Sequence, residues 1–124
     1  MKKIILIFVI TFASCNFPMS DSDEELPNNY MFSYEGGRQN RVVRDHQFVI
    51  DSGAVSASFD DKYIFFSEDT TYSMEPKKVS KKILRYYICD IKKDTLSKPL
   101  NYNFFKNFIL KNKINDDLDI SKDE

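Results

Sequence analysis

The hydrophobic and polar positions between residues 30 and 91 follow the pattern of short β-strands separated by turns. Runs rich in Val, Ile, Tyr and Phe end in residues that favour turns, such as the glycines at 36–37 and the Asp-Ser-Gly at 51–53. The segment 67–78 is polar and contains a proline, so we expect a loop there. The predicted strands cover residues 30–34, 41–50, 54–59, 62–66 and 79–91.

Beyond Pro99 the spacing of the apolar residues changes to that of a helix. They recur three and four positions apart and form one stripe, which consists of Phe104, Phe105, Phe108 and Ile109. Asn101 is placed to cap the start of this helix. The sequence therefore predicts an α+β domain, with a small antiparallel sheet of four or five strands in a meander and one C-terminal helix packed on it.

The first fifteen residues have the pattern of an export signal. Lys2 and Lys3 precede an apolar run at 4–12, which narrows to small residues before Cys15. As a helix, this run of about nine residues would span roughly 14 Å, against a hydrocarbon core of ~30 Å. It is too short to stay in the bilayer as a spanning helix, so we expect a signal peptide at residues 1–14 that is cut off.

Residues 12–15, Phe-Ala-Ser-Cys, resemble the lipobox of bacterial lipoproteins. In that family the cysteine sulfur receives a diacylglycerol, the chain is cut before the cysteine, and the new amine is acylated with a fatty acid such as palmitate. The resemblance implies lipidation of Cys15, and two or more acyl chains hold a protein stably on a membrane. The alternative is a cut after Ala13, which would leave Cys15 as a free thiol.

The rest of the chain divides by composition. Residues 16–25 are polar and acidic, which predicts a flexible tether. Their acidic cluster at 20–25 also resembles the signal that displays some Gram-negative lipoproteins on the cell exterior. The predicted organisation is a signal peptide at 1–14, a lipidated cysteine and acidic tether at 15–29, a single domain at 30–114 and an acidic tail at 115–124.

Charge and cysteine content exclude several classes of site. Loss of Lys2 and Lys3 would lower the basic residues from 18 to 16, against 19 acidic residues, which argues against nucleic acid as a partner. With Cys15 lipidated, Cys89 has no partner for an internal disulfide. One histidine and one spare cysteine do not make a Cys/His metal site, so we expect no metal and no cofactor.

Cys89 and His46 form the one pair that could serve as a thiol nucleophile and its base. In a strand, however, Cys89 shares a face with the apolar residues Ile83, Tyr87 and Ile91, which predicts a small core residue. His46 lies in a polar stretch with nothing that marks it as catalytic. We therefore predict no catalytic residues.

Charged clusters supply the remaining candidates. The acidic residues at 116–119 lack the glycine and the closing glutamate of an EF-hand loop, and the pair at 60–61 predicts a turn. A basic cluster precedes and enters the last predicted strand. It is either a solvated loop or a patch that meets acidic lipid headgroups or an acidic protein. The cluster consists of Lys77, Lys78, Lys81, Lys82 and Arg85.

The domain also resembles a family of small bacterial lipoproteins. The resemblance lies in Leu-Pro at 26–27 followed by Tyr30, Asp-Lys-Tyr-Ile at 61–64, Tyr-Tyr-Ile-Cys-Asp at 86–90, and Pro-Leu at 99–100 ahead of a helix that carries Phe. It covers most of residues 26–110. Each of these stretches is a strand, turn or cap, so the resemblance implies a fold and no activity.

These observations predict a protein of the cell envelope, anchored by lipid on Cys15 and facing outside the cytoplasm. We expect its domain to be a non-enzymatic module that binds an envelope protein, of the inhibitor or immunity type among others. Two alternatives stay open: an envelope thiol hydrolase that uses Cys89 and His46, and a structural component of the envelope.

Overall fold

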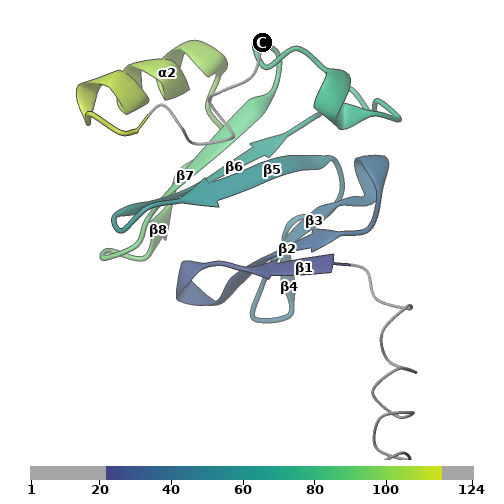
Figure 1. The fold of residues 1–124 in the computed structure, drawn as a ribbon, viewed down its shortest axis with the longest axis horizontal. Helices are drawn as coiled ribbons and strands as arrows, with labels where there is room; N and C mark the ends of the chain where they lie inside the picture. Colours follow the sequence, from purple (N-terminus) through teal and green to yellow (C-terminus); the bar gives the residue numbers. More distant parts are fainter. Residues whose placement is uncertain (1–21, 116–124) are drawn as a thin grey trace, which may run out of the picture.

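Residues 22–115 are the part of the chain that the computed structural model describes, and in them eight strands form two antiparallel sheets (Figure 1). The N-terminal sheet consists of β1 (Ser22–Glu25), β2 (Tyr30–Tyr34), β3 (Arg41–Arg44) and β4 (Gln47–Ile50). The C-terminal sheet consists of β5 (Ala54–Phe59), β6 (Tyr63–Glu68), β7 (Arg85–Asp90) and β8 (Thr95–Leu96). Each sheet is a meander, because its strands pair in the order in which they occur in the chain.

The predicted α+β class and antiparallel strands are confirmed, whereas the prediction of one sheet is wrong. The run at 41–50 is a hairpin, in which Asp45 and His46 adopt φ values of 50° and 67° in a two-residue turn. After β4, Gly53 at φ 80° turns the chain into the second sheet. A Cβ at Gly53 would lie 2.5 Å from the carbonyl oxygen of Asp69, so this crossover requires glycine.

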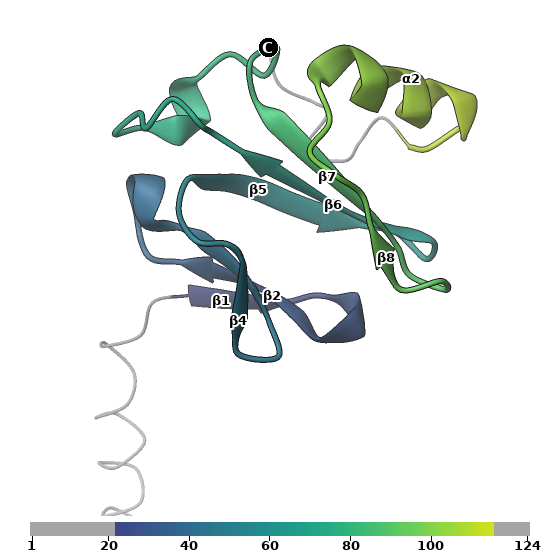
Figure 2. The ribbon, with the colours of Figure 1, turned by 180° about the vertical axis from the view of Figure 1, so that it is seen from behind.

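In this part of the chain, two hydrophobic cores separate three layers. The first core lies between the facing sides of the two sheets and contains Leu26, Tyr30, Phe32, Val42, Ile50, Ala54, Ala57, Ile64, Phe66 and Cys89. The second lies between the C-terminal sheet and α2 (Tyr102–Lys111), which covers the other side of that sheet (Figure 2). It contains Val55, Phe65, Leu84, Tyr86, Ile88, Phe105 and Ile109. Strand β6 supplies both cores, which explains its unbroken apolar run.

Helix α2 begins where the sequence predicts. The Oδ1 atom of Asn101 accepts a hydrogen bond from the backbone N–H of Phe104 at 2.8 Å, as an N-cap does. Phe105 and Ile109 are fully buried and Phe108 is half-buried, in agreement with the predicted stripe. The prediction that Phe104 belongs to this stripe is wrong, because Phe104 is 57% exposed. It lies one position away from the residues that face the sheet.

The predicted strand at 79–91 is shortened to β7. The chain turns before this strand, where the N–H of Ile83 donates to the carbonyl of Ser80 at 3.0 Å. The hydroxyl of Tyr86 donates to the carbonyl of Lys81 at 2.6 Å and holds the turn in place. Ile83 is therefore exposed and does not share the buried face of Cys89. The two residues of β8 are too short to show a strand period, so the sequence does not reveal this strand.

The predicted tether at 15–29 is folded from residue 22 onward. Strand β1 pairs with β2, and the carboxylate of Glu24 accepts a hydrogen bond from the hydroxyl of Tyr34 at 3.1 Å. A short 3₁₀ turn, η1 (Pro27–Asn29), then leads into β2. Acidic composition alone indicated disorder, but Leu26 is buried in the core and fixes the segment. Residues 15–21, and 116–124 of the predicted tail, lie outside the described residues. Within residues 22–115, no helix has the length and apolar character that a membrane crossing needs.

Candidate functional site

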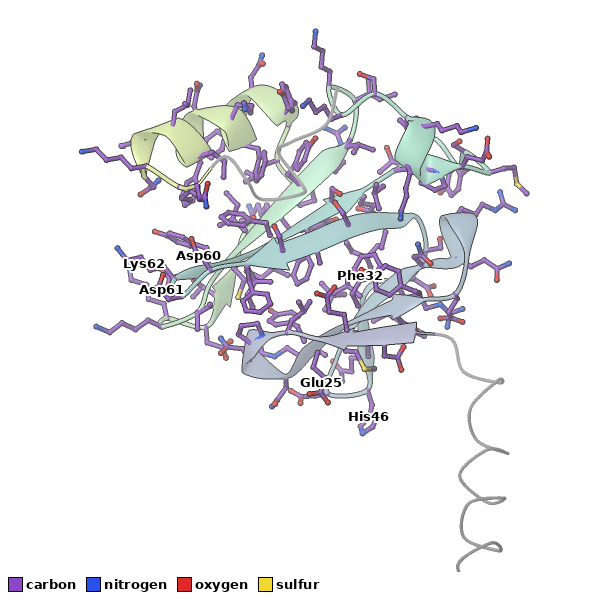
Figure 3. The ribbon with its side chains drawn as sticks, viewed as in Figure 1. Glu25, Phe32, His46, Asp60, Asp61 and Lys62 are labelled. Atoms are coloured by element: carbon purple, nitrogen blue, oxygen red, sulfur yellow. The ribbon has the colours of Figure 1, made fainter. Side chains whose placement is uncertain are left out.

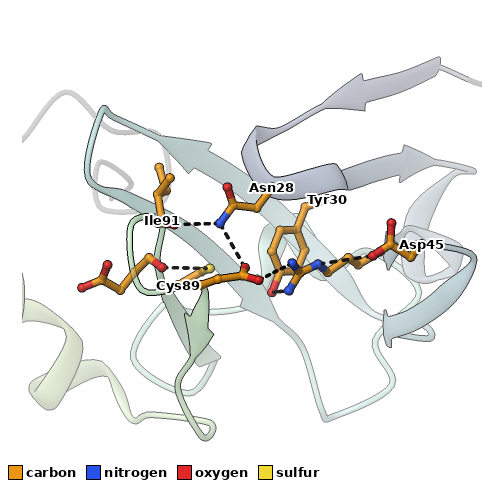
Figure 4. Close-up of polar contacts among 8 residues, drawn as sticks. Asn28, Tyr30, Asp45, Cys89 and Ile91 are labelled. Carbon is orange, nitrogen blue, oxygen red and sulfur yellow. Dashed lines mark hydrogen bonds and ion pairs between the residues drawn. The ribbon is translucent and has the colours of Figure 1, made fainter.

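Cys89 is part of the core between the two sheets, as its strand position predicts. Its side chain is fully buried, and its Sγ lies 3.8 Å from the carbonyl oxygen of Asp90 (Figure 4). Burial raises the pKa of the Cys89 thiol, so the nucleophilic thiolate is disfavoured. A thiol in this position cannot meet a substrate unless the sheets separate.

His46 lies far from that core, in the exposed turn between β3 and β4. Figure 3 shows it beyond the N-terminal sheet, on the side that faces away from the C-terminal sheet. Cys89 is enclosed between the two sheets, so the structure does not bring the thiol and the imidazole together. The geometry of a Cys–His nucleophile is therefore not formed.

A polar cluster joins the two sheets near Cys89, and Figure 4 shows its contacts. The Nη2 of Arg44 contacts Oδ2 of Asp94 at 2.7 Å, and its Nη1 donates to the hydroxyl of Tyr30 at 3.3 Å. The Nδ2 of Asn28 donates to Oδ1 of Asp94 and to the carbonyl of Ile91, both at 3.0 Å. The hydrogen bond from Arg44 lowers the pKa of Asp94 and keeps it charged.

This cluster fastens η1 and β3 to the turn between β7 and β8. The contacts that Asn28 and Arg44 make with Ile91 and Asp94 join residues 50 to 66 positions apart in the chain, so no local sequence pattern could predict them. The carboxylate of Asp94 already accepts hydrogen bonds on both oxygens from within the protein. The cluster therefore links the two sheets through contacts between side chains.

A hollow of about 520 Å³ opens on the outer side of the N-terminal sheet, and we call it the outer hollow. It is lined by Glu25, Leu26, Asn29, Tyr30, Met31, Val43, Asp45 and His46. Figure 3 shows Glu25 and His46 side by side on this side of the sheet. Apolar side chains form its floor, and two carboxylates and an imidazole stand around it.

Beside the outer hollow, a row of side chains crosses the four strands. Glu25 pairs with Met31, Met31 with Val43, and Val43 with Phe48. Phe48 is 57% exposed, and the guanidinium of Arg41 lies 5.0 Å from the centre of its ring. An exposed aromatic ring under an arginine, next to a hollow, is a surface on which another molecule can pack.

The five predicted basic residues lie on one loop and the strand that follows it. Lys77 and Lys78 belong to the short turn η3 (Pro76–Lys78), Lys81 and Lys82 follow it, and Arg85 begins β7. We call residues 69–84 the basic loop. Lys81 is half-buried and the other four are exposed. Lys78 contacts Glu75 at 3.3 Å, an exposed pair that leaves the loop positively charged.

The basic loop also exposes three large apolar residues, which the sequence did not single out. Tyr72 is 73% exposed, Met74 is 72% exposed, and Ile83 is also exposed. Apolar side chains and lysines therefore share one projecting segment. Single exposed apolar residues are ordinary, but three of them on a lysine-rich loop form a distinct surface.

Asp69 fixes the start of the basic loop. Its residue is buried, and its carboxylate accepts hydrogen bonds from the N–H of Thr71 at 2.9 Å, the hydroxyl of Thr71 at 2.5 Å and the N–H of Ser73 at 3.0 Å. Burial opposes ionisation, but the three hydrogen bonds outweigh it and lower the pKa of Asp69. The carboxylate thus holds Tyr72 at a left-handed φ of 61°.

We expect Asp69→Asn to destabilise the domain by about 1–3 kcal/mol near neutral pH, because hydrogen bonds to a charged acceptor are the stronger kind. A lowered pKa in the folded state gives stability that is complete above the unfolded pKa of about 3.9 and is lost as pH falls through the folded pKa. The difference in unfolding free energy between the two proteins should therefore shrink below about pH 4. Denaturant titrations at several pH values measure it.

Asp61→Asn, in the exposed turn after β5, is the control for the loss of one negative charge. It should leave stability near neutral pH almost unchanged. A difference between wild type and Asp69→Asn that stays constant down to pH 2 would show that the charge of Asp69 does not hold the loop.

Comparison with known proteins does not add to this picture: no family model, no curated protein and no solved structure matches the chain. The resemblance to small bacterial lipoproteins therefore stays a prediction. Among residues 22–115, no three His, Cys, Asp or Glu side chains gather in a group that could hold a metal ion. What the described surfaces can bind must follow from their own side chains.

Proposed function

We propose that this chain is a lipid-anchored protein of the bacterial cell envelope, held outside the cytoplasm by acyl chains on Cys15. We further propose that its domain is a non-enzymatic module that binds another protein. The Phe-Ala-Ser-Cys at residues 12–15 supports the anchor. The observation that carries the binding role is the row beside the outer hollow, in which Met31 and Val43 are half-buried and Phe48 is exposed, on a sheet whose other side already forms the core.

The composition of this surface favours a protein partner. Interfaces between proteins are enriched in aromatic residues, methionine and arginine, and the row combines Phe48, Met31 and Arg41. The sheet keeps these side chains in place without a partner, because its inner side packs on the C-terminal sheet. A preformed surface of this kind loses little conformational freedom on binding.

The charges around the outer hollow indicate what the partner presents. Glu25 and Asp45 are exposed carboxylates in its lining, which also includes Met31 and Val43, and Asp45 lies 3.7 Å from Nε of Arg44. A partner segment with an apolar side chain flanked by lysine or arginine would fill the floor and pair with the rim.

Site-specific photocrosslinking in intact cells tests this proposal. A benzoylphenylalanine placed at Phe48 should give one adduct of discrete mass, and the adduct should disappear when Glu25→Lys reverses the charge of the rim. Phe104 is the matched control, since it is the same residue type, is also 57% exposed and lies on α2, in another layer of the molecule. We expect no discrete adduct from position 104.

The variants also separate binding from folding. Phe48 and Glu25 are exposed, so neither change should alter the melting temperature by more than a few degrees. Equal adducts from positions 48 and 104, or no adduct from either position, would contradict the proposal that this surface binds a protein.

A further inference from the structure

We infer that the basic loop lies against the anionic phospholipid headgroups of the membrane that holds the anchor. This inference rests on the proposed lipid at Cys15, and it assigns the loop to the bilayer rather than to an acidic protein. Three observations carry it: where the chain enters the domain, how much chain separates that point from Cys15, and which side chains the loop exposes.

The described chain begins at the same end of the molecule as the basic loop. In Figure 1, the start of β1 lies at the lower right and the loop between β6 and β7 at the upper right, and in Figure 2 they lie at the lower left and the upper left. The turn between β5 and β6, with Asp60, Asp61 and Lys62, lies at the opposite end in Figure 3. One end of the domain therefore carries both the entry of the chain and the basic loop.

Only seven residue steps connect Cys15 to Ser22, the first residue of β1. A fully extended chain spans at most about 3.3–3.6 Å per residue, so Ser22 stays within roughly 25 Å of the lipidated sulfur. The start of β1 is thereby kept near the headgroups, and the basic loop lies on the same side of the domain in Figures 1 and 2.

The exposed side chains of this end suit an anionic bilayer. Lys77, Lys78, Lys82 and Arg85 supply positive charge, and anionic lipids attract such clusters when they are held close to the surface. Tyr72 and Met74 project from the same loop and can enter the boundary between headgroups and acyl chains, where tyrosine is enriched in membrane proteins.

Few acidic groups of the basic loop itself oppose this contact, whereas the entry of the chain carries Asp23, Glu24 and Glu25. Glu75 pairs with Lys78, Glu68 accepts a hydrogen bond from the hydroxyl of Tyr87, and Asp69 is buried. Between η3 and Gly37, a hollow of about 290 Å³ is lined by the apolar residues Ala54, Met74 and Pro76 and by Lys77, Lys78 and Glu75, of which Glu75 pairs with Lys78. Cations above an apolar recess match a phosphate headgroup and the start of its acyl chains.

A tryptophan reporter tests the contact, because the chain contains no tryptophan of its own. The full lipidated protein carries Tyr72→Trp in the basic loop or Phe59→Trp at the opposite end. Each is bound to vesicles of phosphatidylcholine alone or mixed with phosphatidylglycerol, and brominated lipids quench any indole that reaches the acyl boundary. We expect a blue shift and quenching at position 72 in the anionic vesicles only, and no change at position 59.

The contact should also depend on charge. Reversal by Lys77→Glu, Lys78→Glu and Lys82→Glu should reduce quenching at position 72 to the level of position 59. Added salt should do the same to the unreversed loop, which provides a readout if the triple variant does not fold. These two losses together support an electrostatic contact.

The outcomes separate the two proposals. A protein that does not float with either kind of vesicle lacks its anchor, which contradicts the proposed function and this inference with it. If the protein floats with the vesicles, its anchor is present. If position 72 then shows no response, or the same response as position 59, the proposed membrane contact is wrong. In that case the basic loop is either a solvated loop or the binding site of an acidic protein.

Discussion

Phe105→Ala is expected to leave the domain largely unfolded. The ring of Phe105 is fully buried between α2 and the C-terminal sheet, stacked on Tyr86 at 4.4 Å and edge-on to Phe65 at 5.7 Å between ring centres. Truncation of a buried Phe to Ala costs about 3–5 kcal/mol, and a small domain has only about 5–15 kcal/mol of stability. Cys89, the cysteine of the described chain, is free, so no disulfide there offsets the loss.

The neighbouring residue gives a close control. Phe104→Ala removes the same side chain from the same helix, but from an exposed position, so its effect on unfolding free energy should stay within about 0.5 kcal/mol. Denaturant unfolding followed by circular dichroism, and limited proteolysis, measure both variants. Similar losses from the two changes would mean that α2 does not pack on the sheet through Phe105.

Cys15→Ser is expected to abolish lipid attachment completely. If the diacylglycerol is joined to the sulfur of Cys15, a hydroxyl in its place cannot be modified in the same way, and the cut before residue 15 should also fail. Cells fed an alkyne fatty acid should give a labelled wild-type protein and an unlabelled variant. Mass spectrometry of the N-terminal peptide should show the acylated cysteine in wild type alone.

Cys89→Ala is the matched control, since Cys89 is the other cysteine of the chain. Cys89 lies in the core between the sheets. The Cys89→Ala protein should therefore keep its fatty-acid label unless it is degraded. Label that persists in Cys15→Ser and disappears in Cys89→Ala would refute the anchor. Loss of label from both variants with normal protein levels would show that the label depends on the fold rather than on one sulfur.

The sequence predicted those elements whose signals are local. The cap of Asn101 and the spacing of Phe105 and Ile109 predict α2 directly, and the segments bounded by turn residues predict β2 and β5. A pattern of period two shows which residues are buried but does not show which strands pair. The turn at Asp45 and His46 and the crossover at Gly53 divide the strands into two sheets, and both depend on left-handed backbone conformations.

The candidate surfaces also differ in whether a local sequence pattern predicts them. The basic residues at 77–85 are visible as a cluster in the sequence, and Cys89 is visible as a core residue from its strand neighbours. The outer hollow combines side chains from β1, β2 and the β3–β4 hairpin, so no single stretch of sequence predicts it. Exposure of Tyr72 and Met74 was also hidden, because tyrosine and methionine are buried as often as not.

The local pairing of the strands has a consequence for how the chain folds. In residues 22–115, each β-ladder joins strands that are neighbours in sequence, and the longest connection within a sheet is the one at 69–84. Closing short loops costs little chain entropy, so each hairpin can form without waiting for a distant partner. A chain that emerges from its N-terminus can complete the N-terminal sheet before β7 exists. Until the C-terminal sheet docks, Phe32, Val42 and Ile50 face water, so we expect this docking to be the step that brings distant parts of the chain together.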